Sequence, residues 1–406
     1  MLLCLKRRLS LIIAQTEEVK MKNSNEIRFR PSGRLVIMQV SDAQDMKYIR
    51  KAMAKMLDNA YDMIKPDLVL FTGDNILGNH LLDARFGSRQ IAGGKAATMR
   101  VMRESIDNIC APLEKRKIPF AMIYGNHDDR NLVSKDEQAD IYRSYSMCLP
   151  MNNRNGSVDC DTYNIPVLPA EGDSPVFNLW MLDSAWYDKK ADKCFEAIKP
   201  ETVAWYKKTA AKLAEENGGT PVPSLMFAHI PLPAILNLVE QCGANDIGAV
   251  NTHERGWCRL RPDLARGTLK EYPSVLADDA GLFDAAVQFG DVKGIVSGHD
   301  HMNCFEGKYK GIEFVQTSCA SFRCYGDGSR GVRVFEFDAR DPADYTTYFF
   351  NYADLCGRGA AAKLRYFWDA DEKEKQKAAV LAGTAAAAAA GIAGAFLRKN
   401  NIFLIG

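Results

Sequence analysis

The sequence has no excess of charge of either sign. Its 406 residues include 52 lysines and arginines and 51 aspartates and glutamates, which gives a formal net charge of +1 at pH 7. A balanced chain has no overall attraction to nucleic acid or to acidic lipid, so any charge-based function must be local. We therefore expect no specific nucleic-acid partner. Hydrophobic residues make up 47% of the chain, which is enough for a full core, so general disorder is not expected.

Paired cysteine spacings are also absent. The 11 cysteines are scattered and odd in number, and the closest pair, Cys319 and Cys324, is too widely spaced for a zinc knuckle. We expect free thiols in a reducing compartment rather than a disulfide framework. The apolar run after Lys6, Arg7 and Arg8 is about six residues long, shorter than the roughly 7–15 residues of a secretory signal. Both features predict a cytoplasmic location.

Long hydrophobic runs are missing from most of the chain. We predict a lead-in without fixed order over residues 1–30, one large folded domain over residues 31–370, and a charged segment with an alanine-rich tail over residues 371–406. Residues 378–397 are uncharged and match the roughly 20 residues that span a bilayer. Few of them are strongly apolar, so two interpretations stay open: a membrane anchor, or an alanine-rich helix in water.

Short apolar runs alternate with helical periodicity through the predicted domain. This alternation predicts an α/β sheet with helices on its faces. Strands are expected at residues 34–40, 68–71, 120–124, 176–182, 225–228 and 294–296, and helices at residues 48–64, 97–115 and 201–216. From residue 308 to residue 338 the chain becomes rich in β-structure.

Acidic, amide or imidazole side chains follow five of these strands. In an open α/β sheet the carboxyl ends of the strands face the ligand crevice, so these side chains are expected at one rim. They are Asp42, Gln44, Asp74, Asn126, His229, His299 and His301. Carboxylates and imidazoles buried together would repel or change protonation, whereas divalent cations would neutralise the carboxylates. A set of oxygen and nitrogen ligands without thiolate suits Mn²⁺, Fe²⁺, Zn²⁺ or Mg²⁺. Two such ions would clamp an in-line displacement at phosphorus.

The ordered motifs resemble those of the calcineurin-like metallophosphoesterase superfamily. The matching elements are Asp42-Ala43-Gln44, Gly73-Asp74, GNHDD at 125–129, HIPLP at 229–233 and GHDHMN at 298–303. The longer stretches are similar to the purple-acid-phosphatase-like branch, and the resemblance covers roughly residues 33–340. It implies a four-layer α/β/β/α sandwich with mixed sheets. It also implies a dinuclear metal centre that hydrolyses phosphomonoesters or phosphodiesters by attack of a metal-bound hydroxide.

The resemblance also implies a role for each matching residue. One ion would be held by Asp42, Gln44, Asp74 and His301, and the other by Asp74, Asn126, His229 and His299, with Asp74 as the bridge. His127 would protonate the leaving oxygen or stabilise the transition state, and Asp128 would orient the His127 ring. Beside these motifs we consider Asn75 and Arg130 as substrate contacts, with a surface ion pair as the alternative for Arg130.

Two positions depart from the pattern of the resemblance. Histidine is usual where Gln44 stands, and an amide oxygen is a weaker ligand that favours Mn²⁺ or Mg²⁺. Leu77 occupies the place of the metal-binding tyrosine of purple enzymes, so no purple colour is expected. Because of Gln44, a non-catalytic interaction module with the same fold remains an alternative, and a hydrolase of another bond is a third hypothesis.

The sequence also gives expectations for the partners of the protein and for the loops around the site. The partner of an enzyme of this class is a phosphoester substrate, and membrane contact is expected only if residues 378–397 form an anchor. Residues 241–263 have little periodicity and are expected to form a loop that shapes specificity. Tyr325 precedes a turn at residues 326–330, and we expect it outside the site, with a place inside the site as the alternative.

Overall fold

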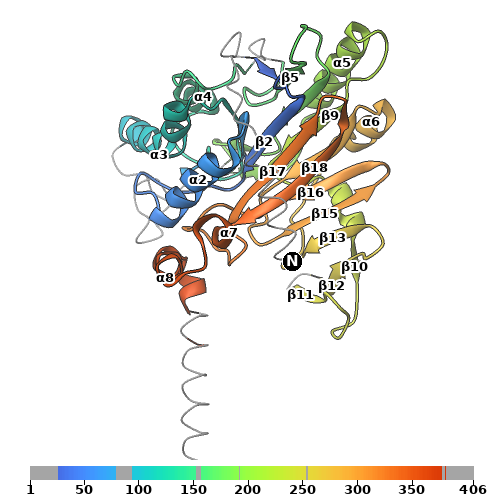
Figure 1. Ribbon diagram of the computed structural model, residues 1–406. Coiled ribbons are helices and arrows are strands. Elements are labelled where there is room, and N and C mark those ends of the chain that lie inside the picture. Colours follow the sequence, from blue (N-terminus) through green and yellow to red (C-terminus); the bar gives the residue numbers. More distant parts are fainter. Residues whose placement is uncertain are drawn as a thin grey trace, which may run out of the picture.

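The structure is a computed structural model that describes residues 26–78, 94–151, 157–191, 193–252, 255–376 and 380 (Figure 1). The predicted lead-in before residue 26, and the tail at 378–397 apart from Val380, lie outside this part of the chain. Within the described ranges, no helix combines the length and the hydropathy of a membrane span. The ten cysteines that fall in these ranges are free thiols, as predicted.

One half of the fold is a five-stranded sheet with the order β18-β17-β2-β3-β4. Its strands are β2 (Arg34–Val40), β3 (Leu68–Thr72), β4 (Phe120–Ile123), β17 (Gly331–Asp338) and β18 (Asp341–Asn351). β2, β3 and β4 run parallel, whereas β17 and β18 form an antiparallel hairpin that pairs with β2. On its outer side lie α2 (Lys51–Ile64), α3 (Gly94–Arg116) and α4 (Lys135–Arg143), coloured blue to teal in Figure 1.

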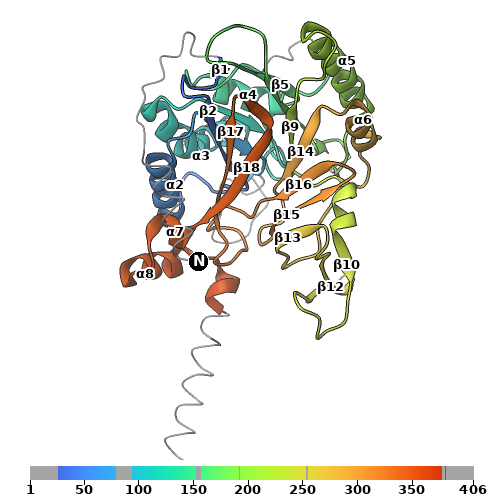
Figure 2. The ribbon, with the colours of Figure 1, turned by 45° about the vertical axis from the view of Figure 1, so that its right-hand side comes forward.

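The other half is an eight-stranded sheet with the order β1-β5-β6-β9-β14-β16-β15-β13. Its strands are β1 (Ile27–Arg28), β5 (Tyr163–Leu168), β6 (Phe177–Leu182), β9 (Ser224–Ala228), β13 (Ala265–Thr268), β14 (Val292–Ser297), β15 (Cys304–Tyr309) and β16 (Ile312–Gln316). β6, β9, β14 and β16 are parallel neighbours. α5 (Pro200–Glu216) and α6 (Leu282–Phe289) lie on its outer side, at the right of Figure 2.

The remaining elements are short and lie outside the two large sheets. They are β7 (Trp186–Asp188), β8 (Lys193–Phe195), the 3₁₀ helix η2 (Pro233–Leu238), β10 (Val239–Gln241), β11 (Val250–Thr252), β12 (Gly256–Leu260), α7 (Tyr352–Cys356) and α8 (Ala360–Asp369). The predicted loop at 241–263 therefore contains two strands, because β12 pairs with both β10 and β11. Local pairing, rather than an apolar pattern, forms this small sheet.

The two large sheets pack face to face through aromatic side chains. The rings of Phe177 in β6 and Phe337 in β17 lie 4.8 Å apart between centroids. Because side chains alternate along a strand, Trp180 of β6 points to the opposite face, where it packs on Tyr206 of α5. Burial of each such ring stabilises the fold by about 1.5–3 kcal/mol relative to exposure. Helices, two sheets and helices thus form four layers, and the predicted α/β/β/α sandwich is confirmed.

A buried arginine fixes the C-terminal part of the described chain to this fold. Arg330 has no exposed surface, and its guanidinium donates to the carboxylates of Asp371 at 2.6 Å and Glu374 at 2.5 Å. The same guanidinium donates to three backbone carbonyls between residues 321 and 327, in the loop before β17. The segment that follows α8 is therefore tied to that loop through one positive charge.

We expect Arg330→Met to lower the free energy of unfolding by about 3–5 kcal/mol, because removal of one partner leaves buried charges unpaired. Arg340→Met is the matched control, since Arg340 pairs with Asp338 while its own side chain is 89% exposed. The control should change stability by less than about 1 kcal/mol. Urea unfolding of both variants measures the difference, and equal losses would contradict the importance of the buried pairs.

Candidate metal centre

The predicted ligands lie where parallel strands of the two sheets end. Asp42 and Gln44 follow β2, Asp74 follows β3, Asn126 follows β4, His229 follows β9, and His299 and His301 follow β14. All of these side chains are buried except that of His299, which is half-buried. Both sheets therefore contribute to one rim, as the direction of their strands requires.

Two carboxylates connect the two halves of this rim. The Nε2 atom of His229 lies 3.5 Å from Oδ1 of Asp74 and 3.9 Å from Oδ1 of Asp42. The Nε2 atom of His301 lies 3.5 Å from the same oxygen of Asp42. Asp74, His229 and His299 offer ligand atoms that all lie within 4.8 Å of one another. The two separations of 3.5 Å are expected for pairs of atoms that each lie about 2.0–2.2 Å from a common ion.

The loops of the smaller sheet are held against Asp74. The Nε2 atom of Gln44 donates to Oδ2 of Asp74 at 3.0 Å, which leaves the amide oxygen of Gln44 available. The backbone N–H of His127, next to Asn126, donates to Oδ1 of Asp74 at 2.8 Å. Gly125 permits this close approach, because a Cβ atom at that position would lie 2.2 Å from the same oxygen.

Backbone carbonyls orient two of the imidazole rings. Nδ1 of His229 lies 3.0 Å from the carbonyl oxygen of Thr72, and Nδ1 of His301 lies 2.8 Å from that of Tyr325. In each ring Nδ1 donates its proton to the carbonyl, so Nε2 is the ring atom that faces the rim. This arrangement of the outer hydrogen bond is typical of metal-binding histidines.

Four donor atoms of the rim are buried and have no hydrogen-bond partner within the described ranges. They are Asp42 Oδ1, Gln44 Oε1, Asn126 Oδ1 and His229 Nε2. A buried polar atom without a partner costs roughly 1–3 kcal/mol, so four neighbouring ones need compensation. Three oxygens and one imidazole nitrogen are ligand types that divalent cations take. The residues present therefore fit a site for divalent metal ions.

The backbone at the rim is strained. Non-glycine residues with a positive φ include Asp42 at 50°, Gln44 at 33°, Asp74 at 48° and His299 at 71°. Each such residue costs on the order of 1–3 kcal/mol and persists only where its surroundings determine it. Here the Asp42 N–H donates to the Gly73 carbonyl at 3.1 Å, and the Gln44 N–H donates to the Asp74 carbonyl at 2.8 Å. All four of these rim residues are predicted to hold metal, and a positive φ also occurs elsewhere in the described chain, at Lys65, Lys117, Ala280 and Lys310.

Charge interactions shift the pKa values of the rim in opposite directions. Burial alone would lower the pKa of His229, but the Asp74 and Asp42 carboxylates raise it to about 9. Burial and the nearby His229 lower the pKa of His299 to about 4. Burial opposes ionisation of Asp42, yet His229 and His301 hold the pKa of Asp42 below its usual value. The carboxylates stay ionised, and a cation can take the place of the His229 proton.

The predicted contact between Asp128 and the His127 ring is wrong. One carboxylate oxygen of Asp128 accepts from the backbone N–H of Ile76 at 3.0 Å and the other from that of Gly125 at 2.7 Å. Nδ1 of His127 has no hydrogen-bond partner in the described part of the chain. Asp128 therefore braces the loops after β3 and β4 instead of the His127 ring. Burial and the charge of Asp74 raise the pKa of Asp128 to about 8.

The two predicted substrate contacts lie away from the open cleft. Asn75 is buried, and its amide donates to the carbonyl of Ile123 at 2.8 Å, so it joins β4 to the loop after β3. Arg130 is half-buried and lies near enough to His127 for its charge to lower the pKa of that ring, after the larger effect of burial. Neither side chain lines the cleft described next.

A cleft of about 810 Å³ opens beside the rim. Its lining includes Gln44, Asp74, Leu77, His127, His299 and His301. Tyr325 also lines it and stacks on His301, with ring centroids 4.2 Å apart and planes 6° apart. The Tyr325 hydroxyl donates to Glu271 at 3.0 Å. Tyr325 therefore belongs to the site, contrary to the expectation from its turn, because its ring and its carbonyl both hold His301.

Several other residues of the cleft could not be predicted individually from the sequence. They are Asn251, Lys270, Glu271, Tyr272 and Arg323, together with Asp371–Lys373. Asn251 lies in β11, within the segment 241–263 that is expected to shape specificity, and the others reach the rim from loops or from the C-terminal segment. The position of Asp371–Lys373 follows from the Arg330 ion pairs, which only the folded chain forms.

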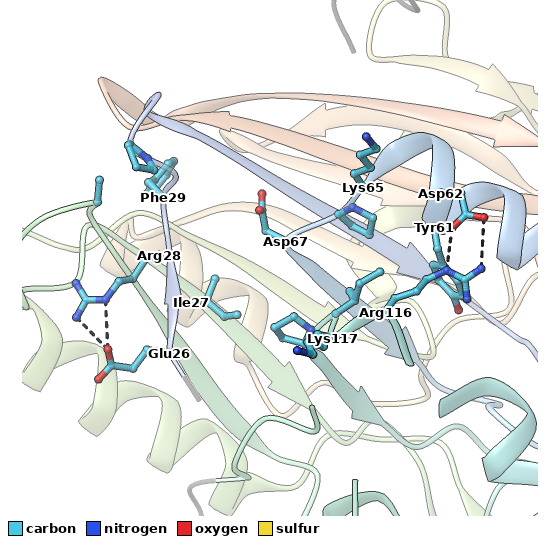
Figure 3. A pocket seen from close by; sticks show the side chains of 15 residues that line it. Glu26, Ile27, Arg28, Phe29, Tyr61, Asp62, Lys65, Asp67, Arg116 and Lys117 are labelled. Carbon is cyan, nitrogen blue, oxygen red and sulfur yellow. Dashed lines mark hydrogen bonds and ion pairs between the residues drawn. The ribbon is translucent and has the colours of Figure 1, made fainter. Parts of the chain in front are cut away.

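A second cavity, of about 770 Å³, lies at the opposite ends of β2, β3 and β4 (Figure 3). Its arginines already have acidic partners: Arg116 pairs with Asp62, and Arg28 pairs with Glu26. Its lining contains none of the predicted metal ligands. The two cavities are therefore separate, and the chemistry of the motifs belongs to the cleft at the rim.

Comparison with known proteins finds relatives along most of the chain. A protein of Arabidopsis thaliana named "Probable inactive purple acid phosphatase 29" is 25% identical over 346 residues, which cover 77% of this chain and 79% of that protein. "Probable inactive purple acid phosphatase 14" of the same plant is 26% identical over 349 residues and 77% of each chain. "Phosphatase DCR2" of Saccharomyces cerevisiae is 27% identical over 187 residues, 44% of this chain and 28% of its own.

Solved structures and a family model were compared as well. A dimetal phosphatase from Danio rerio aligns with a TM-score of 0.42 at 11% identity, and the alignment covers 78% of this chain and 99% of that one. The model of the calcineurin-like phosphoesterase family matches residues 35–303, from β2 to the end of the GHDHMN motif. That range contains every predicted ligand, and the chain belongs to the calcineurin-like phosphoesterase family.

Proposed function

We propose that this protein is a metal-dependent phosphoester hydrolase with a dinuclear centre. The observation that carries the proposal is the convergence of four buried donor atoms that have no partner in the described part of the chain: Asp42 Oδ1, Gln44 Oε1, Asn126 Oδ1 and His229 Nε2. Membership of the calcineurin-like phosphoesterase family supports the same reaction class. The open cleft beside these atoms has room for the ester.

The proposed ligands divide into two overlapping sets. One ion would be held by Asp42, Gln44, Asp74 and His301, and the other by Asp74, Asn126, His229 and His299. When bound, the ions would activate a water molecule and polarise the phosphoryl oxygens as Lewis acids. Gln44 supplies a neutral oxygen in place of an imidazole, so we propose Mn²⁺ or Mg²⁺ at the first position.

His127 is the proposed acid or transition-state stabiliser. Its ring lines the cleft, and its backbone N–H is held by Asp74, which sets its distance from the ligands. Burial lowers the pKa of His127, so its ring releases a proton to a leaving oxygen more readily. The Asp128 brace keeps this loop in place through the backbone.

Basic side chains at the cleft favour an anionic substrate. Lys270 and Arg323 line the cleft but already contact Asp327 and Asp45. Lys373 lines the cleft and is exposed. We propose Lys373 as a contact for a phosphoryl or other anionic group of the substrate.

A non-catalytic module that holds metal is the second candidate function. Two observations favour it: the amide at Gln44, and the word "inactive" in the names of three Arabidopsis relatives that are 24–26% identical. Those names describe the relatives. The presence of His127 in the cleft favours turnover in this chain.

We expect the protein to hydrolyse p-nitrophenyl phosphate or bis(p-nitrophenyl) phosphate when Mn²⁺ is supplied. His127→Ala should lower kcat by about 10²–10⁴, the usual contribution of a general acid, while the metal content stays unchanged. Lys190→Ala, a substitution of an exposed residue outside the cleft, is the control and should leave kcat as it is. Full metal loading without turnover of any ester would favour the non-catalytic module.

We expect Gln44→His to slow metal loss during dialysis, because an imidazole binds these ions more strongly than an amide oxygen. Elemental analysis of dialysed samples gives the retained metal per chain. Gln44→Leu should have the opposite effect, since it removes the only oxygen that this side chain offers. Equal retention in all three proteins would rule out coordination by Gln44.

A further inference from the structure

The helix α8 has an unusual distribution of side chains. Its residues Ala362 and Asp369 are buried, and the Asp369 carboxylate accepts from the backbone N–H of Ala52 at 2.6 Å, at the start of α2. No local side chain caps α2, so Asp369 serves as its cap from a distance. One face of α8 is thus fixed to the body of the protein.

The opposite face of α8 is apolar and exposed. Leu364 is 67% exposed, Phe367 46% and Trp368 75%. With 3.6 residues per turn, residues spaced three and four apart lie on one face of a helix, so these three side chains form one stripe. Both views place α8 at the periphery of the molecule, beside α7 and below α2 (Figures 1 and 2). A contiguous stripe of large apolar residues is uncommon on a surface without a partner.

Basic residues border this stripe on both sides. Lys363 and Arg365 immediately flank Leu364 and are both exposed. Each is rotated by about 100° from Leu364 around the helix axis, in opposite directions. Long basic side chains in this position can reach anionic headgroups while the apolar stripe is buried between them. Tryptophan, phenylalanine and leucine are typical of the apolar face of helices that lie in the interface of a bilayer.

We propose that the stripe Leu364, Phe367 and Trp368 docks into the surface of an anionic lipid bilayer. The two basic residues that flank the stripe, Lys363 and Arg365, complement such a surface, although the whole chain has a net charge of only +1. The sequence that follows α8 also supports a lipid bilayer as the partner of the stripe. Residues 378–397 carry no charge and are bordered by Lys377 and by Arg398. The proposal does not depend on catalysis, and it concerns a helix that lies flat on the bilayer.

Docking of α8 would bring the cleft near the lipid. Asp371–Lys373 line the cleft and begin two residues after the end of α8. The Arg330 ion pairs hold Asp371 in that position. The docked helix and the lining of the cleft would therefore be separated by one residue of the chain, Ala370.

Quenching of tryptophan fluorescence by brominated lipid tests the proposal on the full chain. The protein has five tryptophans, of which Trp368 lies on the stripe and Trp257, 39% exposed, lies on β12. Vesicles of brominated phosphatidylcholine with phosphatidylserine should quench the wild-type emission. Trp368→Phe should remove most of this quenching, whereas Trp257→Phe should leave it in place. Leu364→Ser with Phe367→Ser should lower vesicle partitioning by at least about tenfold.

Three results would overturn the proposal. The first is an absence of vesicle binding. The second is binding with the same quenching in Trp368→Phe as in the wild type, which would assign the contact to another segment. The third is self-association without lipid that Leu364→Ser abolishes, because a second copy of the chain would then cover the stripe. Unfolding midpoints of the variants verify that these exposed substitutions leave the fold intact.

Discussion

The burial of two carboxylates is the constraint on which the rim depends. Asp42 and Asp74 have almost no exposed surface, and burial opposes the ionisation of Asp42 more than the charge of Asp74 does. His229 and His301 offset this cost, and both come from the facing sheet. The aromatic contacts between the sheets, such as that of Phe177, therefore also maintain the balance of charge at the rim. Without that packing the carboxylates would lose their compensating groups.

The ligands could be placed from the sequence because each follows an apolar run directly. Strand direction then decides which end of the sheet carries Asp42, Asp74 and His229. The partners of Asp128 could not be predicted in this way, because they are backbone N–H groups that only the folded loops bring together. Tyr325 is a similar case. It lies 24 positions after His301 in the sequence, in a loop without periodicity that follows β15 and β16.

The four layers of the fold were expected from motif resemblance and not from periodicity. Apolar runs indicate strands but do not specify how two sheets face each other. Strands can also form where periodicity predicts none. In residues 241–263, β11 and β12 pair locally without an alternating apolar pattern. At Gln44 the structure explains what the sequence left open. The amide nitrogen donates to Asp74, so the amide oxygen stays as a neutral, buried atom without a hydrogen-bond partner in the described part of the chain.

Arg330 joins the C-terminal segment to the loop before β17, where Phe322 also packs on Tyr366 of α8. On one side it holds the segment after α8, and on the other it holds the loop that presents Tyr325 to His301. A linkage of hydrogen bonds and a ring contact thus runs from the segment after α8 to a side chain of the rim. Proteolysis after residue 370 would cut that linkage and remove Asp371 and Glu374, the two carboxylate partners of the buried Arg330 guanidinium.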